Sequence, residues 1–277
     1  MIHTMKAVPN APTTPVEING DTPTLRLFSL LEVVASKDQF FSLQGLSEET
    51  NIPKPTLHRM LQQLESAGLL ERSADSRQYG TGIRLRKLAE NLLINDTFHG
   101  ARHGVLRALV QEVGESCNLT ALSGSEVMYL DRVETPAPLR FYLHSGSRVP
   151  VHCSASGKLF LAGMTPAQRQ RLLSHTPLEA FTHKTLTQRD LLEEEIKQVK
   201  RQGFALDNEE FLPGLLCVAV LVPSAAGRSN LCVAVQAPIM RLTPEKALSL
   251  LPALRRAADA LSRIENDALE SLRPPSA

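Results

Sequence analysis

The sequence has no apolar run of about eighteen residues, which is the length that a helix needs to cross a membrane. Residues 1–21 contain no apolar core of signal-peptide length, so we expect the protein to reside in the cytoplasm. The same residues are rich in proline and threonine and are predicted to form a disordered tail. With 277 residues, the chain has room for one large domain or two small ones.

Cysteine is scarce, and no two cysteines have the CxxC spacing that is typical of zinc sites. In a reducing compartment we therefore expect buried thiols rather than disulfides or a metal centre, and we expect no cofactor. The four cysteines are Cys117, Cys153, Cys217 and Cys232.

Sequence signatures of catalysis are also missing. In the segment PVHCSASGKLF, residues 150–160, Leu159 follows Gly157-Lys158 where a phosphate loop needs serine or threonine. The serines of this segment lack the flanking glycines of a hydrolase nucleophile elbow, and the chain has no HExxH. These absences favour a protein that is not an enzyme. A small-molecule-converting enzyme with a helical appendage is the alternative.

The charge of the chain is nearly balanced overall but not locally. A formal net charge of +1 argues against a protein that coats nucleic acid. Between residues 51 and 87, however, seven basic residues stand against three acidic ones. A local basic patch of this kind is what a compact duplex-binding module needs. Its basic residues are Lys54, Arg59, Arg72, Arg77, Arg84, Arg86 and Lys87.

The hydrophobic pattern of residues 22–82 predicts three helices followed by a β-hairpin, which together form a winged helix-turn-helix. Gly68 is placed to end the third helix as a C-terminal cap. A further helix over residues 83–93 is predicted to be a linker, within the segment 83–98. The three helices are predicted over residues 24–36, 42–50 and 53–67, and the two strands over 69–72 and 78–81.

Two prolines, Pro53 and Pro55, stand where the third helix begins. The first N–H groups of a helix have no partner within it, so proline is tolerated there and fixes the start. The outer face carries His58, Arg59 and two glutamines rather than the Glu–Lys pairs of an ordinary solvated face. We interpret this face as one that reads duplex DNA, with a solvated helix of a three-helix core as the alternative. The predicted DNA-binding residues are Lys54, Pro55, Thr56, His58, Arg59, Gln62, Gln63 and Arg77.

Residues 99–277 mix apolar strands with amphipathic helices, which predicts an α/β domain around one sheet. The whole chain is therefore predicted to belong to the α+β class. Strands are predicted over residues 116–123, 126–133, 139–146, 215–222 and 230–237, and helices over 101–113, 155–164, 166–175, 191–201 and 244–272.

Four stretches resemble the IclR family of bacterial transcription regulators. They are residues 25–93, YLDRVETPAPLRFYLHSGSRVPVHCSASGKLFLA (129–162), KRQGFALDNEEFLPGLLCVAV (200–220) and LCVAVQAPIMRLT (231–243). The resemblance implies a ligand-responsive DNA-binding regulator, a repressor of a catabolic operon rather than an activator, with a GAF-like effector-binding domain. It also implies a homodimer or homotetramer on double-stranded operator DNA. Pro55 stands where the family often has serine, so base preference is not carried over.

The resemblance further implies a pocket for a small organic effector, either a carboxylate or an aromatic catabolite. Members that bind very small keto acids carry serines on the late strand, where this chain has Ala234 and Gln236. We therefore expect a larger, partly apolar ligand. Ser156 as a helix cap, Cys217 as a core thiol and the acidic residues at 207–210 as a solvated turn stay open as alternatives. The implied effector-binding residues are Leu143, Ala155, Ser156, Asp207, Cys217, Ala234 and Gln236.

Overall fold

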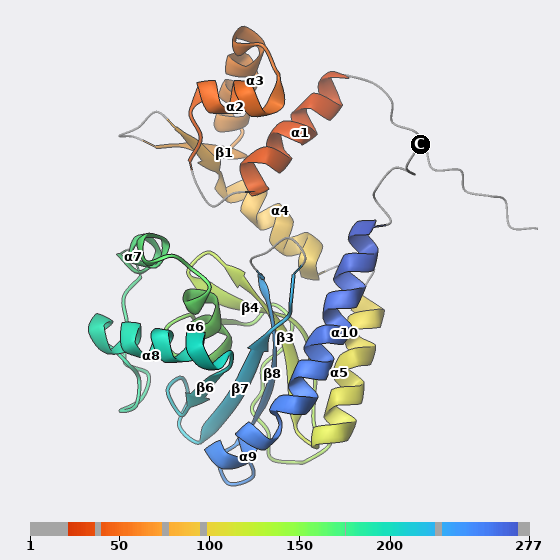
Figure 1. The fold of residues 1–277 in the computed structure, drawn as a ribbon, viewed down its shortest axis with the longest axis vertical. Helices are drawn as coiled ribbons and strands as arrows, with labels where there is room; N and C mark the ends of the chain where they lie inside the picture. Colours follow the sequence, from red (N-terminus) through yellow and green to blue (C-terminus); the bar gives the residue numbers. More distant parts are fainter. Residues whose placement is uncertain are drawn as a thin grey trace, which may run out of the picture. The chain divides into compact units, whose positions relative to one another are not determined.

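The computed structural model describes residues 22–36, 40–73, 78–94, 99–174, 176–224 and 229–270. The predicted tail and Arg77 lie outside the described residues. The chain divides into two compact units, Met1–Leu88 and Ala89–Ala277 (Figure 1). Among the described residues, no helix is long and apolar enough to span a membrane.

The described residues from 22 to 81 form three helices and a two-stranded antiparallel hairpin, as predicted for a winged helix-turn-helix. Leu30, Leu46 and Leu57, one from each helix, are fully buried in a shared core. Because the apolar stripe of the third helix faces this core, its polar face points to solvent. The elements are α1 (Pro23–Ser36), α2 (Leu43–Thr50), α3 (Lys54–Ser66), β1 (Leu70–Arg72) and β2 (Tyr79–Thr81).

Helix α3 begins at Lys54, with Pro53 as its N-cap residue and Pro55 in its first turn. Asn51, which ends α2, has a φ of 55°, in the left-handed region that asparagine tolerates. The chain therefore turns from α2 to α3 within three residues, and the prolines fix where α3 starts, as the sequence predicts.

Gly82 joins β2 to the predicted linker helix, α4 (Ile83–Ile94). A Cβ atom at Gly82 would lie 2.5 Å from the carbonyl oxygen of Gly68, which is too close for any side chain. Arg84 donates a hydrogen bond to the carbonyl of Ala67 (2.8 Å). These contacts fix the first turn of α4 to the end of α3, and the division between the two units falls within α4.

In the described part of the second unit, six strands form one antiparallel sheet in the order β5-β4-β3-β8-β7-β6. Two strands that are far apart in the sequence, β3 and β8, therefore pair at its centre. The strands are β3 (Ser116–Ser123), β4 (Glu126–Val133), β5 (Arg148–Pro150), β6 (Ala205–Asn208), β7 (Leu215–Leu221) and β8 (Leu231–Pro238).

Helices cover both faces of this sheet (Figure 1). Helices α5 and α10 lie side by side on one face, against alternate strand residues such as Leu119 and Val233. Helices α6 and α8 pack on the other face, against Ala219 and Ala234. This is the predicted α/β arrangement around one sheet. The helices are α5 (His99–Val113), α6 (Ala155–Ala162), α7 (Pro166–Ser174), α8 (Arg189–Gln202), α9 (Pro244–Ser249) and α10 (Leu251–Glu270).

The predicted strand over residues 139–146 is wrong. This segment is irregular, and β5 begins only at Arg148. The carbonyl of Phe141 accepts a hydrogen bond from the guanidinium of Arg132 (2.9 Å) rather than from the backbone N–H of a neighbouring strand. Tyr142 is 81% exposed, so the apolar residues of the segment do not mark a buried strand face.

Two further predictions need correction. The predicted closing helix over residues 244–272 is two helices, because Pro252 lacks the N–H that would continue the hydrogen-bond ladder past Leu250. Asp207, which was expected in a loop, lies on β6. The chain turns only after this strand, where Glu209 has a φ of 62°.

Candidate functional site

The polar face of α3 is open to solvent along its length. Leu57, Leu61 and Leu64 are buried on the opposite side of the helix. Of the predicted contacts on α3, Thr56 is half-buried, and the exposed ones are Lys54, Pro55, His58, Arg59, Gln62 and Gln63. The two faces thus have separate roles, one in the core and one available to a partner.

The N-terminal turn of α3 has the properties of an anion site. Pro55 has no N–H, so Lys54 and Thr56 supply the free N–H groups of this turn. The positive end of the helix and the Lys54 ammonium favour a phosphate group there. On α3 the sequence has no acidic residue before Glu65, so nothing on the first turns of this helix opposes an anion.

Basic residues near the hairpin make contacts within the first unit. Arg86 donates to the carbonyl of Thr81 (2.7 Å) and lies 3.4 Å from the Glu71 carboxylate. Arg72 lies over the ring of Tyr79, 5.6 Å from its centre. Both arginines stay exposed, so their charge still adds to the positive potential of this unit.

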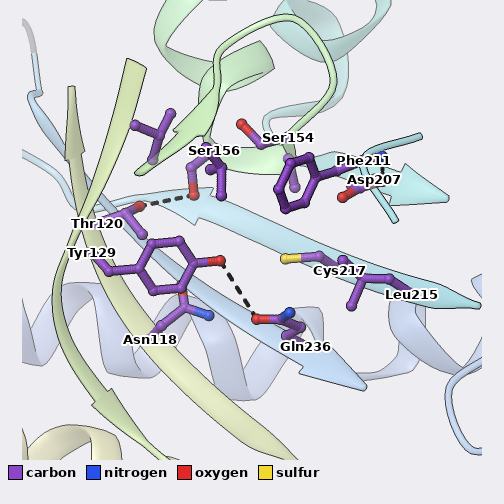
Figure 2. A pocket seen from close by; sticks show the side chains of 13 residues that line it. Asn118, Thr120, Tyr129, Ser154, Ser156, Asp207, Phe211, Leu215, Cys217 and Gln236 are labelled. Carbon is purple, nitrogen blue, oxygen red and sulfur yellow. Dashed lines mark hydrogen bonds between the residues drawn. The ribbon is translucent and has the colours of Figure 1, made fainter. Parts of the chain in front are cut away.

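A cavity lies on the α6 face of the sheet (Figure 2). In this structure the cavity leaves room for about one water molecule, about 10 Å³, and its lining combines amide, hydroxyl and carboxyl groups with apolar side chains. This mixture is typical of a site for a small organic molecule. The lining residues are Asn118, Thr120, Val127, Tyr129, Val149, Ser154, Ala155, Ser156, Asp207, Phe211, Leu215, Cys217 and Gln236.

The strand register explains which residues reach this cavity. Gln236 on β8 pairs with Cys217 on β7, which pairs with Asp207 on β6, so the three side chains lie in one row on the same face. The neighbouring row consists of alanines that belong to the core beneath α6, and their small side chains let the helix approach the sheet. These alanines are Ala205, Ala219 and Ala234.

Helix α6 brings its N-terminal turn to the cavity. Ser154 is the N-cap residue and accepts a hydrogen bond from the N–H of Gly157 (3.3 Å), so the cap is Ser154 rather than Ser156. A Cβ atom at Gly157 would lie 2.2 Å from the carbonyl oxygen of Val151, so only glycine allows this packing. Ser156 instead shares a hydrogen bond with Thr120 (2.9 Å, Figure 2). The N–H groups of Ala155 and Ser156, the first two residues of α6, remain to bind an anionic ligand.

Asp207 is the acidic group of the cavity and is only 2% exposed. Its Oδ1 accepts hydrogen bonds from the N–H groups of Glu210 (2.8 Å) and Phe211 (3.2 Å). Burial raises the pKa of Asp207 to about 7, although these N–H groups and Lys158 favour the charged form. Near neutral pH the carboxyl therefore exists in both protonation states and can donate to a ligand or accept from it.

A buried cluster of charges stands behind Asp207 and fixes the loop that follows it. The ammonium of Lys158 on α6, 1% exposed, contacts Glu195 on α8 (3.0 Å) and Glu210 (2.6 Å). Phe211, the next residue, is thereby held against the cavity. Because Asp207 and Glu210 are buried, a solvated turn does not describe them.

Five of the predicted effector-binding residues line the cavity. They are Ala155, Ser156, Asp207, Cys217 and Gln236. Leu143 and Ala234 do not belong to its described lining and pack in the hydrophobic core of the same face. Cys217 belongs both to the lining and to that core, and burial raises the pKa of its thiol. All four cysteines are buried free thiols, as predicted.

The sequence prediction missed Asn118, Thr120, Tyr129 and Phe211 in the lining. The first two alternate with Cys117 and Leu119 along β3, and this alternation was the available signal. An alternating pattern does not distinguish a polar face toward solvent from a polar face toward a cavity. Among the described residues, no group of three or more histidine, cysteine or acidic side chains could hold a metal ion.

Two family models match the sequence and together span most of the chain. Residues 24–74 match the IclR helix-turn-helix domain, which contains α3. Residues 95–263 match the bacterial transcriptional regulator IclR C-terminal domain, which contains the cavity. The chain belongs to the IclR family.

Relatives of this IclR-family chain are named as regulators. It is 42% identical over 243 residues to the probable transcriptional regulator SauR of Cupriavidus necator, covering 88% of this chain and 96% of that one. It is 28% identical over 243 residues to the transcriptional repressor IclR of Escherichia coli K12, covering 87% of each. An IclR homologue from Microbacterium hydrocarbonoxydans, solved in complex with 4-hydroxybenzoate, shares the fold with a TM-score of 0.54 and 23% identity, covering 87% of this chain and 98% of that one.

The IclR-family chain is therefore a DNA-binding transcriptional regulator with a helix-turn-helix domain and a C-terminal α/β domain of the effector-binding type. A small-molecule-converting enzyme is not favoured, because the matching family and the named relatives are regulators.

Proposed function

We propose that this regulator represses a catabolic operon and that a small organic effector controls its affinity for operator DNA. Residues 22–82 bind the DNA, residues 83–98 link the two parts, and residues 99–277 bind the effector and join two or four copies. The observation that carries the proposal is an exposed polar face on α3 in the same chain as a buried polar cavity. Bacterial operator DNA lies in the cytoplasm, so we propose that the protein acts there.

The proposed DNA contacts come from α3 and from the hairpin. Arg59 stands about one turn into α3, where a guanidinium reaches a guanine edge or a phosphate oxygen. One winged module buries too little surface for tight specific binding, so two copies on a near-palindromic operator are expected. The contacts are Lys54, Pro55, Thr56, His58, Arg59, Gln62, Gln63 and Arg77.

Arg59→Ala tests the role of α3. We expect specific operator affinity to fall by about 1–3 kcal/mol, in a mobility-shift assay with the DNA upstream of the protein's own coding region. Arg107→Ala is the matched control, because Arg107 is also exposed but lies on α5, and it should bind as the parent protein does. Equal affinity of the Arg59→Ala protein and the parent would contradict the assignment.

The proposed effector is a carboxylate or an aromatic catabolite. Asp207, Gln236 and the first turn of α6 offer polar contacts, while Phe211 and Leu215 offer apolar ones. The homologue solved with 4-hydroxybenzoate supports an aromatic acid as a ligand for this fold. Glu90, on the part of α4 that belongs to the second unit, pairs with Arg148 of the same unit (2.6 Å). We propose that α4 carries the coupling.

A panel of short and aromatic acids, 4-hydroxybenzoate among them, tests the effector site. At least one acid should raise the Tm of the intact protein and change its operator affinity by up to about a hundredfold, the usual range of allosteric coupling. A panel without a hit, beside intact operator binding, would favour a second domain that only joins copies together.

A further inference from the structure

Three buried donor groups gather near one end of the cavity without a hydrogen-bond partner among the described residues. They are the amide nitrogens of Asn118 and Gln236 and the Nε of Arg132. Asn118 and Gln236 are 1% and 2% exposed, and the Arg132 side chain is 4% exposed. Buried donors without an acceptor are costly, so groups of this kind mark a place where a ligand accepts hydrogen bonds.

Arg132 fixes the orientation of the Gln236 amide. Its Nη1 donates to the Gln236 Oε1 at 2.9 Å. A guanidinium has donors only, so the amide oxygen must face it, and the flipped amide would oppose N–H groups to N–H groups in a buried place. The hydroxyl of Tyr129 lies 3.5 Å from the same oxygen (Figure 2). The NH₂ group of Gln236 is therefore left for the cavity.

Arg132 is itself held in place. It stands opposite Asn118 across β3 and β4, and its Nη2 donates to the carbonyl of Phe141 (2.9 Å). The Glu134 carboxylate lies 3.8 Å from its Nε, which is beyond hydrogen-bond distance. The guanidinium is thus fixed at two of its three nitrogens while its positive charge stays close to this end of the cavity.

We propose that Arg132 is a positioning residue that sets the hydrogen-bond specificity of the effector cavity. By holding the Gln236 oxygen, it leaves the NH₂ group of Gln236 facing the cavity as a donor, beside the unpartnered amide nitrogen of Asn118. An end of this kind binds a carboxylate or another oxyanion in preference to the neutral amide of the same shape. The reason is that the NH₂ group of the ligand amide would face the NH₂ groups of the cavity, whereas both carboxylate oxygens accept from them. The inference rests on the proposed function, since it assigns the chemistry of the same cavity.

The test compares acids with their amides in the intact protein. The pairs are benzoate and benzamide, 4-hydroxybenzoate and 4-hydroxybenzamide, and succinate and succinamide, with dissociation constants from calorimetry. The wild-type protein should bind at least one acid about tenfold more tightly than its amide. Arg132→Met, which frees Gln236 to rotate, should bring that ratio to within about threefold. Arg132→Lys keeps a donor for the Gln236 oxygen and should restore the ratio.

The outcomes separate this inference from the proposed function. An Arg132→Met protein that keeps the wild-type ratio would overturn the inference alone. A wild-type protein that binds its operator but none of these compounds would overturn the effector part of the proposed function, and the inference with it.

If Arg132→Met does not fold, a second pair of variants tests the inference. Gln236→Glu offers acceptors where the cavity needs a donor, so it should weaken acid binding more than Gln236→Met does. Acid affinity in Gln236→Glu equal to that of the wild-type protein would overturn the inference.

Discussion

The two units keep the residues that we assign to function in opposite places. On α3 the polar side chains are exposed, while the leucines of the same helix fill the core. In the sheet unit, Asn118, Asp207 and Gln236 are almost completely buried among apolar neighbours. The residues that we assign to function and the residues that stabilise the fold therefore use separate faces in the first unit and share one space in the second. Substitutions should separate the two properties in the first unit but not in the second.

The largest effect on stability is expected from Gly157→Ala in the second unit. The added methyl group would lie 2.2 Å from the Val151 carbonyl oxygen, which is backbone and cannot move without shifting α6. We expect the free energy of unfolding of this unit to fall by more than about 5 kcal/mol, beyond the usual range for one substitution. Urea denaturation followed by circular dichroism measures this change.

Gly104→Ala is the matched control for this substitution. Gly104 lies on α5, and nothing stands within 4 Å of the position of its added Cβ. Alanine there should stabilise the helix by about 0.5–1 kcal/mol. Similar losses of unfolding free energy in both variants would mean that close packing at Gly157 does not cause the loss.

The next largest effect is expected from Lys158→Met. Without the ammonium, the buried Glu210 carboxylate loses its cation, and we expect a loss of about 3 kcal/mol. The double variant with Glu210→Gln should recover part of this loss, because it removes the unpaired charge. Thermal unfolding of the single and double variants measures the difference. A double variant less stable than the single one would contradict this account of the cluster.

Asp207→Asn should give a smaller effect that depends on pH. The folded pKa, about 7, lies above the ordinary value of 3.8, so the folded protein holds a proton that the unfolded chain releases between these values. The contribution of Asp207 to stability is therefore present below about pH 4 and is lost as pH rises through about 7. Asparagine cannot ionise, so the variant should gain roughly 1–3 kcal/mol relative to the parent by pH 8.

Parallel unfolding curves of the parent and Asp207→Asn proteins from pH 5 to pH 8 test this expectation. A difference in stability that does not change over this range would mean that Asp207 stays ionised in the folded protein.

The smallest effect on stability is expected from Gln63→Ala on the exposed face of α3. Its free energy of unfolding should change by less than about 0.5 kcal/mol, as for other surface substitutions. Operator affinity in a mobility-shift assay should still fall, because the side chain lies on the face that we assign to DNA. A large loss of stability would show that this face also serves the fold.

The first unit was predictable because its determinants are local. The leucine spacing of α3, two prolines at its start and Gly68 at its end are all visible within one short segment. The prediction of one closing helix was wrong because Pro252 interrupts the helical hydrogen-bond ladder between α9 and α10.

The cavity was only partly predictable, because pairing between distant strands creates it. Asn118 and Gln236 stand more than a hundred residues apart in the sequence, and only the register of β3 and β8 brings them together. The hydrogen bond from Arg132 to Phe141 lies in the irregular segment 139–146, which the sequence pattern predicted as a strand. The family resemblance supplied five of the lining residues, which the hydrophobic pattern alone did not mark.

The alanines at 205, 219 and 234 have a consequence for how such regulators diversify. Three methyl groups set the spacing between α6 and the sheet. Replacing any one of them with valine would displace the helix, together with Ser156 at its start, without changing a side chain that lines the cavity. Two relatives with identical cavity walls can therefore differ in the molecules they accept.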